Sequence, residues 1–107
     1  MELWIGLLGL KAKPTAKGFR RFGKGKGAYV HVAAWAESYA QFEERVRRAA
    51  DEIDCVLYDL DDVGLLVERL ARPDCPDEFA DMNETARKNK KDAVFGHFYI
   101  WEQDEAN

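Results

Sequence analysis

The fold is decided by residues 28–60, which read AYVHVAAWAESYAQFEERVRRAADEIDCVLYDL. Alternation at 28–36 predicts a strand, and Cys55 to Leu60 predicts another. Between them, Ser38 and Gln41 have the spacing of a capping box, and apolar residues follow at helical spacing, which predicts a helix. A strand, a helix and a strand form a crossover, so we expect the two strands to run parallel with a right-handed connection.

The flanking segments complete an α+β fold. Residues 2–10 are apolar in both alternating sets, which predicts a central strand. A short helix capped by Asp61 or Asp62 and ending near 70, a helix from Pro76, and a strand over 93–102 follow. We expect a single α+β domain over 1–107, a two-layer sandwich with a four-stranded mixed sheet and helices on one face. An antiparallel strand between the parallel pair would make it similar to the ferredoxin-like folds.

The charge is distributed unevenly along the chain. The sequence of 107 residues is 47% hydrophobic and 34% charged, with a net charge of −4, which excludes disorder as the default. The basic Gly/Lys-rich loop at 11–27 holds seven basic residues and no acid, and the remainder holds nine basic and twenty acidic residues. An acidic body therefore displays one cationic loop, and a polyanion would have to bind there.

The sequence also indicates where the protein is located and which cofactors it lacks. Trp4 to Leu10, the longest strongly apolar stretch, is far shorter than the roughly 20 residues that span a bilayer. The start of the chain lacks the pattern of a signal peptide, so we expect a cytoplasmic protein that binds no membrane. Cys55 and Cys75 form no C-x-x-C motif and support neither a disulfide scaffold nor a zinc ribbon. We expect no cofactor and no metal.

One sheet face is predicted to collect aromatic rings. The small residues at 30, 32, 34 and 36 let a helix approach one face, and the other face then carries the remaining side chains of that strand. Either the Pro76 helix or the basic loop covers this second face as ordinary core, or the face is an open interface, which we favour. The predicted interface combines the side chains of this second face with one alternating set of side chains from the last strand. Its residues are Tyr29, His31, Trp35, Phe95, His97, Tyr99 and Trp101.

The basic loop resembles two nucleic-acid motifs only in part. Residues 18–24 match the start of a phosphate loop, but Gly25 replaces the magnesium-binding Ser or Thr and no helix follows, so we reject nucleotide hydrolysis. Cations interleaved with aromatic rings are typical of single-stranded nucleic-acid binders. The residues of this alternative site, which also uses Tyr29, are Lys17, Phe19, Arg20, Arg21, Phe22, Lys24 and Lys26. A solvated loop, or a loop that grips an acidic protein, explains the same residues.

No catalytic residue is predicted. His31 and His97 lack a clear third ligand for a metal, and the serine at 38 already has a capping role. Cys75 has no histidine near it in the sequence. A small dimeric enzyme built around the two histidines is therefore our third hypothesis, by analogy of fold alone.

The leading hypothesis is a non-catalytic protein-interaction module. It self-associates as a homodimer through the aromatic face and presents acidic helices to a basic protein, as a small bacterial inhibitor or immunity protein would. The acidic residues assigned to that contact are Glu43, Glu44, Asp51 and Glu52. The first alternative is the single-stranded nucleic-acid binder.

Overall fold

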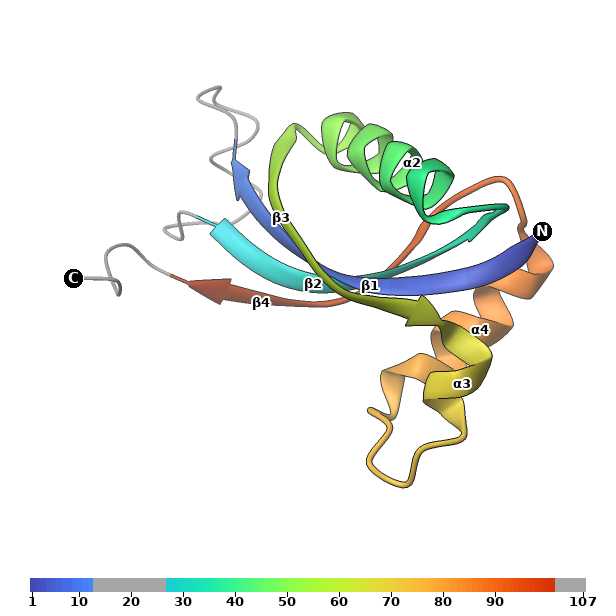
Figure 1. Ribbon diagram of the computed structural model, residues 1–107. Helices are drawn as coiled ribbons and strands as arrows, with labels where there is room; N and C mark the ends of the chain where they lie inside the picture. The colour runs from blue at the N-terminus through green and yellow to red at the C-terminus, as the bar shows by residue number, and fades with distance from the viewer. Residues whose placement is uncertain (13–26, 102–107) are drawn as a thin grey trace.

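The computed structural model describes residues 1–12 and 27–101 (Figure 1). Its sheet has the strand order β3-β1-β2-β4, and the strands are β1 (Glu2–Ala12), β2 (Gly27–Ala36), β3 (Cys55–Leu65) and β4 (Val94–Trp101). The described residues also form helices α2 (Tyr39–Glu52), α3 (Leu66–Leu70) and α4 (Glu78–Lys88). The fold is therefore α+β, with an open four-stranded sheet and three described helices.

All neighbouring strands in the sheet are antiparallel, so the expected mixed sheet is wrong. β2 and β3 do run in the same direction on either side of α2, because both are antiparallel to β1, which lies between them. The central place of β1 is confirmed. Its apolar side chains alternate to both faces, and only a central strand has both faces covered.

Helices lie on both faces of the sheet, not on one as the sequence led us to expect (Figure 1). On one face α2 buries Phe42 and Val46 against β1 and β2. On the other face α4 buries Phe79 and Met82 against Trp35. Since β1 and β2 carry apolar side chains on both faces, a helical layer on one face would leave the second set in water.

Helix α2 begins where its capping residues predict. The backbone N–H of Gln41 donates to Ser38 Oγ at 3.2 Å, and Gln41 Oε1 accepts from the backbone N–H of Glu37 at 2.7 Å. Ser38 thereby satisfies one amide group of the first helical turn, and Gln41 binds the residue that precedes the cap. The stripe of Phe42 and Val46 then faces the small residues of β2, as expected.

The helix predicted from Asp61 or Asp62 is wrong in its first part. Strand β3 continues to Leu65, which pairs with Trp4 of β1, and α3 begins only at Leu66. The ladder shifts register beside Asp62, whose φ is 53°, and Arg69 Nη2 donates to the Asp62 carbonyl at 2.9 Å. The apolar residues of this segment have helical spacing, but its pairing with β1 makes it a strand. Tertiary contacts commonly override such local preferences.

A bulge in β4 changes which side chains share a face. Val32 pairs with Phe95 and Val30 pairs with Phe98, so two residues, Gly96 and His97, lie opposite one residue of β2. Phe95 and Phe98 consequently both pack on the α2 side of the sheet, where their rings stack at 5.7 Å. The placement of Phe95 beside His31 is therefore wrong, because strict alternation fails at a bulge.

Candidate functional site

Three tyrosines form a row across the sheet on the face opposite α2. Tyr29 of β2 pairs directly with Tyr99 of β4, and Gly9 of β1 pairs with Tyr29 on its other side. Tyr58 of β3 completes the row, with its ring centroid 6.4 Å from that of Tyr29 in an edge-to-face contact. We call Tyr29, Tyr58 and Tyr99 the tyrosine plate.

Gly9 makes the row continuous. The ring of Tyr58 lies over this glycine, and a Cβ at position 9 would be 2.9 Å from Tyr58 Cζ and 3.0 Å from Asp59 Cβ. A second register shift in the β1–β3 ladder, between Gly9 and Leu10, directs both Tyr58 and Asp59 toward the glycine. The absence of a side chain at position 9 is therefore what lets Tyr58 reach Tyr29.

The plate lies on the part of the sheet that α3 and α4 leave uncovered. Figure 1 shows the ends of β1, β2 and β4 extending past both helices. Tyr29, Tyr58 and Tyr99 are 39%, 41% and 56% exposed, respectively. The aromatic face predicted from the sequence is thus divided, with one half closed by helices and the other half carrying the plate.

Charged groups lie at the β3 side of the plate. Lys11 Nζ lies 5.0 Å from the centroid of the Tyr58 ring, within the range of a cation–π interaction. Asp59 and Asp61 are exposed on the edge strand β3 beside it. A cation therefore already sits on one ring of the plate, and two carboxylates lie along its margin.

The boundary between the two halves is held by Glu78, the first residue of α4. Its Oε1 accepts a hydrogen bond from the backbone N–H of His97 at the β4 bulge, at 2.7 Å. Its Oε2 lies 3.1 Å from His31 Nδ1, and the His31 ring packs edge-to-face on Phe79 at 4.8 Å. One carboxylate thus joins α4 to β2 and β4, and it brings His31 and the backbone of His97 to the same group.

Trp35 belongs to the closed half. It is 8% exposed, and its Nε1 donates to the Ala86 carbonyl of α4 at 2.8 Å. Arg87 and Lys90 lie over its ring at 5.5 and 5.1 Å. Trp35 is therefore part of the core under α4, and it is not available as an interface residue.

The acidic residues assigned to α2 do not form a purely acidic surface. Glu43 pairs with Arg47 at 2.9 Å, and Glu44, Asp51 and Glu52 are exposed on the same helix. Three arginines, at 45, 47 and 48, alternate with these carboxylates. The helix presents mixed charge, so the margin of the tyrosine plate is the stronger candidate for contact with a basic partner.

Some predicted site residues lie outside the described part of the chain. These are the residues of the cationic loop from Lys17 to Lys26. Trp101 is described only by its backbone pairing with Gly27, at the same end of the sheet as the plate. Within residues 1–12 and 27–101, no three His, Cys, Asp or Glu side chains are grouped as a metal site would need. No helix in these ranges is long and apolar enough to cross a membrane.

Comparison with known proteins identified no similar protein. No protein-family description, curated protein or solved structure matches the chain. The function therefore has to be argued from the site itself.

Sequence reasoning missed Glu78, and it named Tyr58, with Trp4, only as a neighbour of the aromatic face and not among the interface residues. Glu78 follows Pro76 at the start of a helix, where a negative side chain interacts favourably with the helix dipole. The sequence therefore suggests only this local role for Glu78. Nothing local signals its contacts with β2 and β4, which are distant in sequence. Tyr58 could be assigned to the interface itself only once the strand order placed β3 beside β1.

Proposed function

We propose that this chain is a non-catalytic binding protein that contacts its partner through the tyrosine plate. The observation that carries the proposal is the row of three partly exposed rings on the half of the sheet that no described helix covers. Tyrosine is enriched at interfaces because it combines a large apolar ring with a polar tip. A row that crosses the whole sheet offers a continuous surface, unlike single exposed side chains, which are common on any protein.

The partner that fits best is a protein that presents lysine or arginine side chains. Tyrosine rings attract cations, and Lys11 over Tyr58 is an example within the chain. Asp59 and Asp61 at the margin would pair with further cations, and the net charge of −4 favours encounter with a basic molecule. The role of a small inhibitor or immunity-type protein is consistent with this chemistry and is part of the proposal.

A titration with two model peptides tests the proposal. A peptide of alternating glycine and arginine should shift the NMR amide signals of residues 27–31 and 97–99, and a glycine–glutamate peptide of the same length should not. Tyr99→Ser should weaken binding about two- to fivefold, the value of an exposed cation–π contact. Tyr39→Ser is the matched control, because Tyr39 is 47% exposed on α2. Equal effects of the two variants, or preference for the acidic peptide, would contradict the proposal.

Self-association through the plate is the competing form of the proposal, because the same rings cannot be buried against a second copy and against a foreign partner at once. Plate-to-plate packing would bury the rings of two copies against each other, so Tyr99→Asp should convert a dimer to a monomer by placing a carboxylate in the apolar contact. Sedimentation equilibrium over a range of concentrations measures this directly. A parent protein that stays monomeric throughout would refute self-association and leave the plate to a foreign partner.

Single-stranded nucleic acid is the second candidate. The supporting observation is that residues 13–26, with six basic side chains, join the sheet between Ala12 and Gly27, at the end where the plate lies. Bases would stack on the tyrosine rings and phosphates would contact the lysines. Affinity for a short oligothymidine should then fall steeply with salt, and Lys24→Ala with Lys26→Ala should flatten that dependence. Binding that ignores both changes would remove this candidate.

Three expectations from the sequence stay proposals. A ferredoxin-like classification is supported by the split arrangement of β2, α2 and β3 around β1. For a small dimeric enzyme, the supporting contact is that of the His31 ring with Glu78, since His97 reaches Glu78 only through its backbone N–H. A cytoplasmic location rests on the sequence alone.

A further inference from the structure

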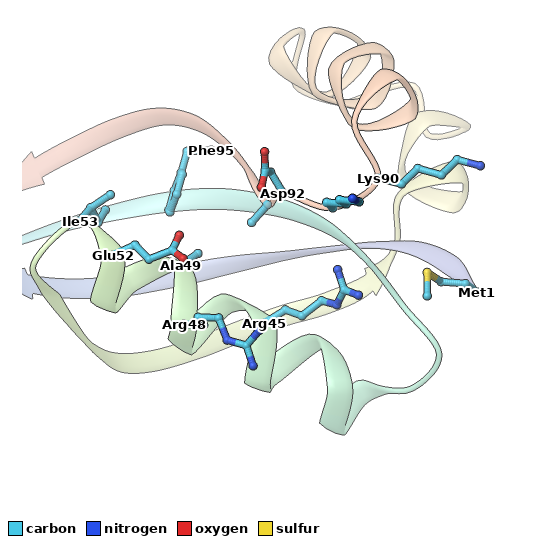
Figure 2. Close-up of a pocket in the computed structure, with 11 residues that line it drawn as sticks. Met1, Arg45, Arg48, Ala49, Glu52, Ile53, Lys90, Asp92 and Phe95 are labelled. Carbon is cyan, nitrogen blue, oxygen red and sulfur yellow. The ribbon is translucent and has the colours of Figure 1, made fainter.

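A groove of about 780 Å³ lies between α2 and the segment that enters β4. Figure 2 shows Arg45, Arg48 and Glu52 along its helical side, with Asp92 and Phe95 on the opposite side. Small-molecule sites usually have volumes of about 300–1,000 Å³, so the groove has the size of such a site. It opens on the face of the sheet that α2 covers, and it is separate from the tyrosine plate.

The groove has an apolar part. Ala49 and Ile53 of α2 and Ala93 and Phe95 at the start of β4 line it. The Phe95 ring stacks on Phe98 with an interplanar angle of 24°, so its position is fixed by packing. An apolar ligand body placed here would be removed from water without rearrangement of the core.

The charged part of the groove has positive side chains without partners. Within the described chain, the side chains of Arg45, Arg48 and Lys91 make no ion pair or hydrogen bond, whereas Arg47, on the outer side of the same helix, pairs with Glu43 at 2.9 Å. The lining carboxylates are Glu52 and Asp92, and Asp92 already accepts a hydrogen bond from Asn89 Nδ2 at 2.7 Å. The groove is thus a cationic region in a chain of net charge −4.

We propose that this groove binds a small organic anion. Its apolar body lies on Ile53, Ala93 and Phe95, and its carboxylate or phosphate is held by Arg45 and Arg48. Guanidinium groups match these anions because their planar donors form paired, charge-assisted hydrogen bonds. The site is independent of the proposed function, since it shares no residue with the tyrosine plate.

The first test is a titration with 1-naphthoate, followed by NMR amide shifts. A ligand of this size that binds with ordinary efficiency should have a Kd of roughly 1 mM. The shifts should centre on Ala49, Ala93 and Phe95. Uncharged 1-naphthalenemethanol and acetate should each bind at least several-fold more weakly, because the first lacks the anionic group and the second lacks the apolar body. 1-Naphthyl phosphate, titrated in parallel, distinguishes a carboxylate site from a phosphate site by its relative affinity.

Variants of α2 provide the second test. Arg45→Gln and Arg48→Gln should each raise the Kd for 1-naphthoate by about tenfold, the value of a lost charge-assisted hydrogen bond. Arg47→Gln is the matched control on the same helix and should leave the Kd unchanged. Circular dichroism verifies that all three variants are folded. No saturable binding, shifts centred on Tyr29 and Tyr99, or an equal effect of Arg47→Gln would overturn the proposal.

Discussion

Replacing Glu78 with alanine removes the carboxylate that joins helix α4 to strands β2 and β4. The side chain is 8% exposed, so its contacts with His31 and the His97 backbone are largely shielded from water. We expect this variant to be clearly less stable than the parent, because both contacts hold α4 on the sheet.

The magnitude follows from the two contacts. A hydrogen bond to a charged group contributes about 1.5–3 kcal/mol, so complete loss of both would cost roughly 3–6 kcal/mol. His97 is an exposed residue, and water takes over its N–H in the variant, so we expect a net loss of about 2–3 kcal/mol. Glu78→Gln keeps an oxygen that accepts from His97 and should lose only about 1 kcal/mol.

Urea unfolding, followed by tryptophan fluorescence, measures these losses. In thermal unfolding, about 2–3 kcal/mol corresponds to a decrease in Tm of roughly 8–20 °C for a domain of this size. Glu84→Ala is the control, since Glu84 lies on the same helix, is 70% exposed and pairs with Lys88 at 3.4 Å. Its loss should stay below about 0.5 kcal/mol. The reasoning is refuted if Glu78→Ala unfolds like this control, or if the glutamine variant is as unstable as the alanine variant.

Three further substitutions test the plate, the closed half and the α2 cap. Gly9→Ala puts a Cβ 2.9 Å from Tyr58 Cζ, so it should cost about 1–3 kcal/mol and abolish the NMR cross-peak between the Tyr29 and Tyr58 rings; an unchanged cross-peak would argue against the role of the glycine. Trp35→Phe removes the buried donor to Ala86 and should cost about 1–3 kcal/mol in urea unfolding, and stability equal to the parent would contradict this. Ser38→Ala should cost about 1 kcal/mol in thermal unfolding followed by circular dichroism, and no loss would mean that the cap is redundant.

Features determined by neighbouring residues could be predicted from the sequence. The start of α2 follows from Ser38 and Gln41, which are three residues apart. The central place of β1 follows from the apolar side chains on both of its faces. Both signals act over one turn of helix or one strand. Such local preferences survive in the folded chain because tertiary packing agrees with them.

Features that depend on distant contacts could not be predicted. Each bulge is marked in the sequence only by an isolated glycine, Gly9 or Gly96, which signals an irregular strand but not the direction of the shift. The displacement of Tyr58 and Phe95 from strict alternation therefore could not be predicted. The side of the sheet that α4 covers depends on which apolar set of β2 it meets. The plate was therefore foreseen as an aromatic face, but its extent and its membership were not.

The two outer strands of the sheet differ in how they discourage main-chain pairing with another molecule. β3 carries Asp59, Asp61 and Asp62 and has two register shifts, features that hinder the docking of a further strand. β4 reads VFGHFYIW, which contains no Asp, Glu, Lys or Arg, and it has no neighbour on its outer side among the described residues. β4 also has a bulge, where the His97 N–H is already bound by Glu78, so the part of this edge without such protection is the segment after the bulge, residues 98–101. At high concentration this segment could pair with another copy of the chain, and the resulting oligomers would resemble a functional dimer in a measurement of size.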